Sequence, residues 1–459
     1  MNHADALLER ISNATAVVGV IGLGYVGLPL ADAVHSSGFR VLGFDIDPKK
    51  PEMLRRAEPY LRHLGEELPR RLASSERFEA TTDFTRLGEC DALIVCVPTP
   101  LNNNHEPDLS YVLGTARDIG RTLRAGQLLV LESTSYPGTT RDDFAPEVLR
   151  SWARTVAQGP AVTPSHPPRA IELGRDVFVA FSPEREDPGN PRHSTRTIPK
   201  LVGGLDDASR DLAVALYSKA VESVVPVASA EVAEAAKLLE NIFRAVNIAL
   251  VNEMKLVLGA MGIDVWDVVR AASTKPFGYM PFYPGPGLGG HCIPIDPFYM
   301  AWKARQVGRP TRLIELAGEV NVSMPRHVIG RLSEALDERG VPLAGARVLV
   351  LGLAYKPDID DVRESPSFEL IRLLRDAGAN PDYSDPHVPA TWPGRKGDLG
   401  MTSVTLDARS IASYDAILMS TNHRAFDYPT LARHARLIID TRDAFRDFAP
   451  IMGERLVKA

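Results

Sequence analysis

The chain has 459 residues, 44% of them hydrophobic, and a formal net charge of -6. This length exceeds what one hydrophobic core usually supports, so we expect two or three domains. The two signs of charge are interspersed without a basic stripe, which argues against nucleic acid as a partner. Three cysteines are too few for a disulfide framework or a zinc site, so no metal is expected. The N-terminus lacks an apolar leader and no apolar run could span a bilayer, which predicts a cytoplasmic protein with no membrane partner.

Short β-branched runs alternate with helical segments from Ala16 onward, a pattern typical of a parallel sheet covered by helices. A proline-rich stretch between Trp152 and Gly174 is expected to be an exposed loop. The expected strands are Val17–Ile21, Arg40–Phe44, Ala92–Val97, Leu128–Leu131 and Val177–Phe181.

A glycine turn, Gly22-Leu-Gly24-Tyr25-Val26-Gly27, follows the first expected strand and opens a helix near Leu28. The first glycine makes the tight turn, the second lets the backbone approach a pyrophosphate, and the third permits close helix packing. Asp45 ends the second strand, where a carboxylate binds ribose hydroxyls and repels a 2′-phosphate. The pattern predicts NAD as the cofactor, with a plain glycine turn as the alternative.

Two later turns follow expected strands: Val97-Pro98-Thr99, and Ser133-Thr134 through Thr140. In an open parallel sheet, ligands bind beyond the carboxyl ends of the strands, so both turns should line the cofactor. Helix capping is the alternative role for Ser133 and Thr134. Cys90 and Cys96 are expected to be small core residues.

The segment from Ser229 to Ala260 has apolar residues at helical spacing and predicts one long helix that connects domains and forms a dimer face. A second helical region, Leu313–Leu336, should be interrupted near Pro325. Arg347–Gly352 is another strand-to-glycine turn, and alternating elements follow it. We therefore predict an α/β fold with a Rossmann-type NAD domain (residues 1–210), a central helical dimerisation domain that carries a cysteine loop (211–330), and a smaller Rossmann-like α/β domain (331–459).

Cys292 stands in that loop, Gly285-Pro-Gly-Leu-Gly289-Gly-His-Cys292-Ile-Pro-Ile-Asp296. A lone thiol among glycines, four residues before a carboxylate, is hard to explain as core packing and predicts a nucleophile. Lys237 and Asn241 are one turn apart on the long helix, so a cation and an amide donor point the same way. Lys237 alone would be taken for a surface lysine. Combined with Cys292 and the NAD turn, it indicates covalent oxidoreductase chemistry.

With these residues the chain resembles UDP-sugar 6-dehydrogenases of the UDP-glucose/GDP-mannose dehydrogenase family, from about Val17 to Asp440. The motifs occur in the family's order: Gly-Tyr-Val-Gly-Leu-Pro-Leu-Ala, Ser182-Pro-Glu184-Arg185, Lys237-Leu-Leu-Glu-Asn241, Gly-Gly-His-Cys292, and Gly352-Leu-Ala-Tyr-Lys356 through Arg363-Glu-Ser-Pro. The resemblance implies oxidation of C6 of a UDP-hexose to a carboxylate with two NAD, through a thiohemiacetal and a thioester on Cys292.

The resemblance also implies residue roles. Thr134 and Asp296 hold a water that takes up a proton, Lys237 and Asn241 stabilise oxyanions, and Glu184 serves hydrolysis or substrate positioning. The implied cofactor contacts are Gly22, Gly24, Tyr25, Val26, Gly27, Asp45, Lys50, Val97, Pro98, Thr99, Thr134 and Arg363. The implied UDP-sugar contacts are Glu184, Lys237, Asn241, Phe282, Tyr283, Gly285, Gly289 and Lys356. As alternatives, Lys356 could be a solvated turn lysine and Arg363 could form a salt bridge at a helix start.

Ile295 bears on the choice of sugar, because the UDP-glucose branch has a lysine at this position between the cysteine and the aspartate. The strings from Thr274 to Tyr299 and from Ser182 to Asn190 resemble the UDP-N-acetylhexosamine branch, most closely UDP-N-acetylglucosamine 6-dehydrogenases, which supply surface polysaccharides. UDP-N-acetylmannosamine, UDP-N-acetylgalactosamine and UDP-glucose stay open. Two other hypotheses are a one-step hydroxyacid dehydrogenase and a cofactor-binding scaffold without turnover.

Overall fold

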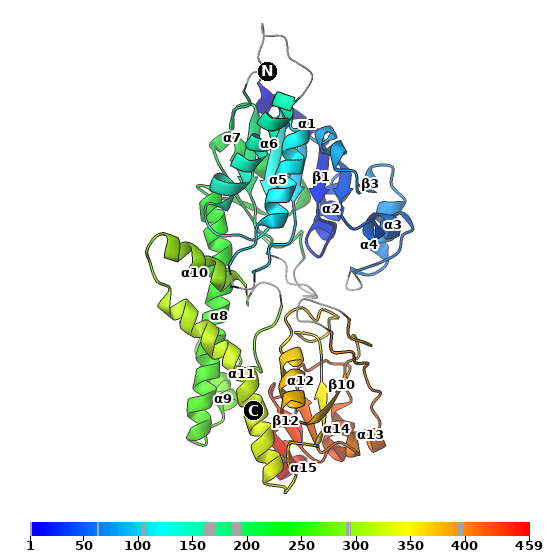
Figure 1. Ribbon diagram of the computed structural model, residues 1–459, viewed down its shortest axis with the longest axis vertical. Coiled ribbons are helices and arrows are strands. Elements are labelled where there is room, and N and C mark those ends of the chain that lie inside the picture. Colours follow the sequence, from blue (N-terminus) through cyan, green and yellow to red (C-terminus); the bar gives the residue numbers. More distant parts are fainter. Residues whose placement is uncertain are drawn as a thin grey trace. The chain divides into compact units, whose positions relative to one another are not determined.

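The computed structural model describes residues 2–61, 64–102, 104, 106–158, 170–185, 194–290, 293, 295–392 and 398–459 (Figure 1). The chain forms two compact units. Unit 1 comprises Met1–Glu240 and Phe298–Gly308, and unit 2 comprises Asn241–Pro297 and Arg309–Ala459. The division into three domains expected from the sequence, with boundaries after residues 210 and 330, stays a prediction. The α/β fold class is confirmed, because each unit is built on its own largely parallel sheet.

The sheet of unit 1 has eight strands in the order β3-β2-β1-β4-β5-β6-β7-β8. All neighbouring strands are parallel except β6 and β7, which are antiparallel. The strand order reverses between β1 and β4, and such a reversal opens a crevice where α/β proteins bind ligands. The strands are β1 (Val17–Ile21), β2 (Arg40–Phe44), β3 (Phe78–Thr81), β4 (Ala92–Val95), β5 (Gln127–Leu131), β6 (Val177–Phe181), β7 (Lys200–Gly204) and β8 (Val224–Pro226).

Helices cover both faces of this sheet, so β4, β5 and β6 are buried along their length, and apart from Gln127 their residues are apolar. Helices α1 (His3–Ser12), α2 (Gly27–Ser36) and α7 (Asp207–Ala220) pack together over one core of the sheet. Helices α5 (Ser110–Thr122) and α6 (Ala145–Gln158) pack side by side over the other face (Figure 1). Helices α3 (Lys49–Arg55) and α4 (Glu67–Ala73) lie beside β3. Helix α10 (Asp296–Gln306) belongs to this unit from Phe298 onward.

Unit 2 contains a five-stranded parallel sheet in the order β10-β9-β11-β12-β13. Alternate residues of β9 face opposite cores: Val348 and Val350 face α11 and α12, whereas Leu349 and Leu351 face α13 to α15. The elements are β9 (Arg347–Leu351), α12 (Pro366–Asp376), β10 (Asn380–Ser384), α13 (Ala408–Ala412), β11 (Ala416–Met419), α14 (Tyr428–His434), β12 (Ile438–Asp440), α15 (Ala449–Met452) and β13 (Leu456–Lys458).

The long helix α8 (Ala230–Ala260) confirms the expected single helix, and α9 (Val265–Ala272) follows it. Helix α11 (Arg312–Asp337) is continuous, so the expected interruption near Pro325 is wrong. Pro325 is buried, and the buried side chains Met324, Val328 and Leu332 extend along the same helix. Packing along this face stabilises the helix through a residue that cannot donate a backbone hydrogen bond.

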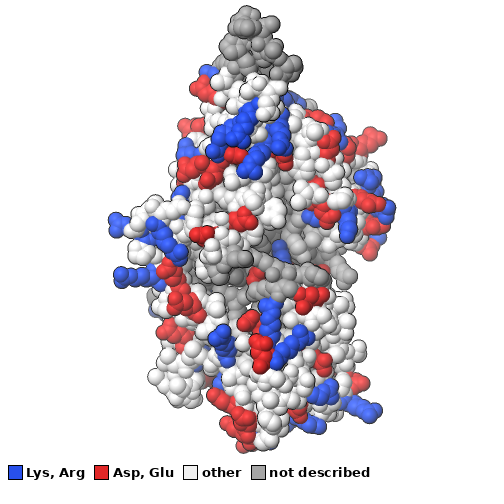
Figure 2. Space-filling model, in the orientation of Figure 1, with Lys and Arg blue, Asp and Glu red and all other residues white. Residues whose placement is uncertain are grey.

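The loop expected between Trp152 and Gly174 is also partly wrong, because α6 continues to Gln158. Residues 159–169 of that stretch lie outside the described residues. Within the described part of the chain, none of the helices is both long and apolar enough to cross a bilayer. Figure 2 shows lysine, arginine and acidic side chains interspersed over the visible surface of each unit, as the sequence indicates.

Asp91 fixes the start of the central strands β1 and β4. It is fully buried and accepts hydrogen bonds from the backbone N–H of Val17 (2.8 Å), from Arg10 (2.6 Å) and from Arg124 (2.8 Å). Its own N–H donates to the carbonyl of Val17 at 2.7 Å. The carboxylate therefore helps to set the register between β1 and β4. This register fixes where the turns that follow the two strands lie at the opposite edge of the sheet.

We predict that Asp91→Ala lowers the free energy of unfolding by about 3 kcal/mol, because a buried N–H loses its acceptor and two guanidinium groups lose their counter-ion. Asp118→Ala is the control: Asp118 pairs with Arg121 on the surface of α5, and its loss should cost less than about 0.5 kcal/mol. Urea unfolding followed by circular dichroism measures both. Equal midpoints for the two variants would contradict the role given to Asp91.

Candidate active site

The glycine turn after β1 has the geometry expected of a dinucleotide-binding turn. Gly22 has a φ of 93°, and its N–H donates to the carbonyl of Phe44 at 2.7 Å. A Cβ on Gly27 would lie 1.9 Å from the carbonyl oxygen of Gly22, so only glycine fits there. A Cβ on Gly24 would meet no described protein atom within 4 Å. Gly22 and Gly27 thus shape the turn, while the space beside Gly24 is open to a ligand.

Asp45 closes the same turn from the end of β2. The carboxylate is buried and accepts hydrogen bonds from the N–H groups of Leu23 (2.8 Å) and Asp47 (2.9 Å). Lys50 donates to it at 2.8 Å. Tyr25 and Val26 lie within the turn, and Val26 directly precedes α2. These residues fit the adenosine half of a dinucleotide, because a fixed carboxylate stands beside a helix N-terminus at the switch point of the sheet.

The turns after β4 and β5 lie at the same edge of the sheet and are joined to each other. The hydroxyl of Ser133 donates to the carbonyl oxygen of Val97 at 2.7 Å. Thr99 is buried, and its carbonyl accepts a hydrogen bond from Tyr299 of α10 at 2.9 Å. Pro98 is exposed and Thr134 is half-buried. The cofactor-lining role of both turns stays a prediction.

Glu234 of α8 anchors the turn that contains Thr134. Its carboxylate accepts hydrogen bonds from the N–H of Gly138 (2.6 Å) and from the N–H (2.9 Å) and hydroxyl (2.6 Å) of Thr140. Burial raises the pKa of Glu234 to about 7 against these three lowering contacts. Since Glu234 lies about one turn before Lys237 on the helix, the turn after β5 is held at a fixed place along α8.

Lys237 and Asn241 are both buried, although each is a polar residue on a helix. The amide of Asn241 donates to Oδ2 of Asp296 at 2.5 Å. Asp296 is itself buried and begins α10. The structure therefore brings together Asn241 and Asp296, which the sequence proposed for the same site. Cys292, four residues before Asp296, lies outside the described residues, as does His291.

The glycines that precede Cys292 pack closely inside unit 2. The N–H of Gly285 donates to Asn252 of α8 at 3.0 Å, and a Cβ on Gly285 would lie 2.7 Å from the Arg442 guanidinium. A Cβ on Gly289 would lie 2.6 Å from Cβ of Tyr355. The N–H of Gly290 donates to the carbonyl of Arg363 at 3.1 Å. The backbone of this segment is thus fixed by α8 and by the segments that follow β9 and β12.

Other predicted substrate residues surround this segment. Phe282 contacts Phe243 edge-on at 5.6 Å, and Tyr283 stacks on Trp266 at 5.5 Å. The ammonium of Lys356 lies 5.9 Å from the ring centre of Tyr355. Arg363 forms an ion pair with Asp361 at 2.6 Å, which is the alternative considered for it, and its contact with a cofactor stays a prediction.

Two cations, Lys255 and Arg442, were missed by the sequence reasoning. Lys255 of α8 is 9% exposed, and its ammonium has no hydrogen-bond partner among the described residues. Burial and, next, the charge of Arg442 lower the pKa of Lys255 to about 8, against the opposing charges of Asp440 and Asp264. Burial lowers the pKa of Arg442, which is half-buried beside Gly285, to about 10. Two cations that repel each other favour an anionic ligand.

A signal for Lys255 was present in the sequence. Lys255 follows Lys237 by eighteen positions, which is about five full turns of an α-helix, so the two lysines lie on the same face. Asn241 and Asn252 lie close to that face, and all four residues are buried. A stripe of lysines and asparagines on the buried face of a helix is unusual for a structural element and indicates a binding surface.

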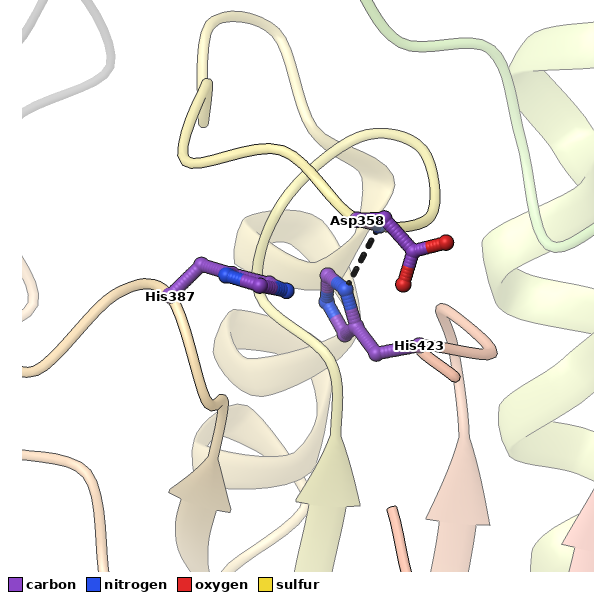
Figure 3. A group of neighbouring side chains, drawn as sticks. All are labelled: Asp358, His387 and His423. Atoms are coloured by element: carbon purple, nitrogen blue, oxygen red, sulfur yellow. Dashed lines mark hydrogen bonds between the residues drawn. The ribbon is translucent and has the colours of Figure 1, made fainter. Parts of the chain in front are cut away.

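Asp358, His387 and His423 form a separate cluster in unit 2, with ligand-type atoms within 4.8 Å of one another (Figure 3). His423 accepts a hydrogen bond on Nδ1 from the N–H of Asp358 at 2.9 Å, so Nε2 carries the proton and donates to Asp385 at 3.0 Å. Both ring nitrogens are engaged, and His423 therefore offers no lone pair to a metal ion. The histidine instead joins the turn after β9 to the end of β10.

The chain is similar to known proteins over most of its length. Models of the UDP-glucose/GDP-mannose dehydrogenase family match in succession: the NAD binding domain over residues 16–221, the central domain over 231–323 and the UDP binding domain over 349–447. The chain is 34% identical to UDP-N-acetyl-D-glucosamine 6-dehydrogenase of Pseudomonas aeruginosa, covering 89% of this chain and 91% of that protein. It is 33% identical to UDP-N-acetyl-D-mannosamine dehydrogenase of Salmonella typhimurium, covering 94% and 99%. The solved UDP-D-ManNAc dehydrogenase of Pyrococcus horikoshii superposes with a TM-score of 0.82 at 28% identity, covering 96% of this chain and 98% of that chain.

We predict opposite outcomes for two glycine variants of the turn. Gly24→Ala should leave the melting temperature within about 2 °C but weaken NAD binding at least tenfold, because the added methyl group occupies only the space open to a ligand. Gly27→Ala should lower the melting temperature by several degrees, because its Cβ collides with the backbone of Gly22. Differential scanning fluorimetry and NAD titration measure these effects. Unchanged NAD affinity in a stable Gly24→Ala protein would contradict the prediction that NAD occupies the space beside Gly24.

Proposed function

Because this chain belongs to the UDP-glucose/GDP-mannose dehydrogenase family and its relatives are named UDP-sugar dehydrogenases, we propose that it oxidises C6 of a UDP-N-acetylhexosamine, foremost UDP-N-acetylglucosamine, to the uronic acid. The product would supply surface polysaccharide synthesis. The observation that carries the proposal is the buried pair of Asn241 and Asp296, joined at 2.5 Å. It provides an amide donor and a carboxylate, and Asp296 follows the proposed nucleophile Cys292 by four residues in the sequence.

The proposed chemistry removes four electrons from C6 in two steps. NAD, when bound at the Gly22–Gly27 turn and Asp45, accepts one electron pair in each step. A water held by Thr134 and Asp296 takes the hydroxyl proton as the alcohol becomes an aldehyde. The sulfur of Cys292 then bonds to C6, the carbonyl oxygen gains a proton, and a thiohemiacetal forms. Its oxidation leaves a thioester, which water cleaves to the carboxylate and the free thiolate.

Lys237 and Asn241 would stabilise the negative oxygen that develops on C6 in these steps, since both are buried on the same side of α8. Their donors are desolvated, which strengthens their interaction with a developing charge. Glu184 follows β6 at the carboxyl edge of the sheet, where it would take part in hydrolysis or position the sugar. Covalent capture on Cys292 would also retain the reactive aldehyde.

The UDP group would bind in unit 2 against Tyr283, Gly285, Gly289 and Lys356. Arg442, which lies beside Gly285, and the buried Lys255 add to this set, because a diphosphate would offset the charge of both. Phe282 and Tyr283 contribute apolar surface to the same region.

The choice of sugar rests on Ile295 and on the surrounding loop sequence. Ile295 is buried, so the polar contact that a lysine would make at this position is absent. The absence of this lysine supports an N-acetylhexosamine over glucose as the sugar. The sequence segment around Cys292 favours UDP-N-acetylglucosamine. UDP-N-acetylmannosamine and UDP-N-acetylgalactosamine are the alternatives, because they differ from it only in the orientation of one substituent. The relatives carry both the glucosamine and the mannosamine name.

A homodimer or a higher homo-oligomer is the proposed assembly. Helix α8 has one buried polar side and another side with large exposed apolar residues, and such a face normally pairs with a second surface. The exposed residues on this side are Leu239, Phe243, Leu250, Met254 and Val257, and Met261 follows directly after the helix. A second copy of the same helix would cover them.

We predict that Cys292→Ser lowers uronic acid formation by roughly a hundredfold or more, because a serine hydroxyl is a far weaker nucleophile than a thiolate. A panel of UDP-sugars is assayed for NADH and acid, with Cys96→Ser as the matched control. The wild type should yield two NADH per sugar. One NADH per sugar would favour a one-step dehydrogenase, and none from any UDP-sugar would favour a scaffold. Near-normal acid formation by Cys292→Ser would contradict the covalent route.

We also predict that Lys255→Met weakens UDP binding at least tenfold, since it removes a charge-assisted contact. The folded pKa of Lys255 is lowered to about 8, so above that pH the free protein holds this amine largely unprotonated. An anion raises the pKa again, and UDP binding by the wild type should therefore take up a proton between about pH 8 and 10. Calorimetry in buffers of different ionisation enthalpy measures this uptake. Lys219→Met, on the surface of α7, should behave as wild type, and full uptake in Lys255→Met would refute the assignment.

A further inference from the structure

A buried charge network lies behind Glu184 in unit 1, and the roles proposed so far do not use it. Lys200, the first residue of β7, is 4% exposed. Its ammonium lies 2.8 Å from Oε2 of Glu132 and 3.6 Å from Oε2 of Glu184. Glu132 is 1% exposed and directly follows β5, immediately before Ser133. One cation thus faces two carboxylates, each next to a turn at the carboxyl edge of the sheet.

The protein holds the carboxylate of Glu132 from two sides. The second oxygen of Glu132 accepts a hydrogen bond from the buried hydroxyl of Tyr217. The Lys200 ammonium also lies 5.2 Å from the ring centre of Tyr217. Burial would lower the pKa of Lys200, but Glu132 and Glu184 raise it above its usual value, so the amine stays charged. Glu132 and Tyr217 therefore hold Lys200 in place, and the charge of Lys200 acts on Glu184.

Stability alone does not account for this network. A fully buried ion pair is often no more stabilising than apolar residues of similar volume, because both charges lose their hydration. The neighbouring residues of β5 and β6 are apolar, and an apolar pair would pack there. The Lys200 ammonium lies inside an apolar sheet, 3.6 Å from the Glu184 carboxylate at the ligand edge. If Glu184 takes part in the reaction, the buried charge of Lys200 has a functional reason.

We infer that Lys200 is a positioning residue whose ammonium, clamped by Glu132 and Tyr217, holds the carboxylate of Glu184 in place for thioester hydrolysis. This inference rests on the proposed function. In that step the water oxygen bonds to the acyl carbon, the C–S bond breaks, and Cys292 leaves as a thiolate. The Glu184 carboxylate takes one proton from the water, and the second is released when the product acid ionises. Lys200 touches neither water nor sugar.

A double variant separates this role from a purely structural one. Glu132→Gln combined with Lys200→Met removes both members of the buried pair, so no charge is stranded in the core, but Glu184 loses its cation. If Lys200 only neutralises Glu132, the double variant should recover wild-type activity. If Lys200 positions Glu184, we expect acid release at least tenfold slower, a first NADH burst close to wild type, and a Cys292 thioester detectable by mass spectrometry.

Rescue by a conservative variant supplies a second readout. Lys200→Met alone removes the cation that faces Glu184, and acid release should slow while the thioester accumulates. Lys200→Arg keeps a cation at this position and should restore acid release toward the wild-type rate, even if its larger head group changes the packing. Lys219→Met, a surface lysine bound to the carbonyl of Ser12, is the matched control.

Glu184→Gln completes the test. Added to the double variant it should cause little further loss, because both changes disable the same group. Fully additive effects, or wild-type acid release in the double variant, would overturn the inference. If that variant does not fold, Tyr217→Phe replaces it, because it removes one of the two groups that hold Glu132 and Lys200 together. Wild-type acid release in Tyr217→Phe would then overturn the inference. A wild-type enzyme that forms no NADH from any UDP-sugar would refute the proposed function instead, and the two failures are therefore distinguishable.

Discussion

Buried carboxylates that accept backbone N–H groups from turns are the interaction on which the rest of this structure depends. A parallel sheet presents its ligand edge as a series of turns, and each turn leaves N–H groups without partners in the strands. Asp45 accepts the N–H of Leu23, and Asp385 accepts the N–H of Leu353 at 2.6 Å in the other unit. Glu234 does the same for Gly138 and Thr140. The turns are therefore fixed before any ligand binds.

The two units use the same local design. Gly22 and Gly352 both have positive φ, and their N–H groups donate to the last residues of the neighbouring strands β2 and β10. A carboxylate then follows each of these strands. In unit 1 it is supplemented by Lys50, whereas in unit 2 it is supplemented by the buried His423. The same arrangement thus forms a turn after β1 that suits a dinucleotide. After β9 it forms a turn that His423 and Asp385 hold to the rest of unit 2.

Buried cations have a different meaning from these carboxylates. Lys200 has two carboxylates within 4 Å and remains charged. Lys255 has no hydrogen-bond partner among the described residues, and its pKa is lowered by burial and by Arg442. A cation that the protein neutralises serves to orient another protein group, and a cation left without neutralisation prepares a place for a negative ligand. Burying a cation costs folding free energy in both arrangements. A cost of this kind is expected where the charge serves function, and both lysines lie near residues proposed for reaction or binding.

The sequence by itself determined the parts that depend on local rules. The β-branched runs gave strands β1, β2 and β6 with their bounds, and the Gly22–Gly27 spacing specified a turn in which positive φ and close backbone approach require glycine. The spacing on α8 placed Lys237 and Asn241 on one face. Tertiary structure decided the rest. Helix α11 passes through Pro325 because packing outweighs the lost hydrogen bond, and Lys200 pairs with Glu132 although 68 positions separate them. No local pattern reports such pairs, because a buried charge is tolerated only where the folded chain brings its partner to it.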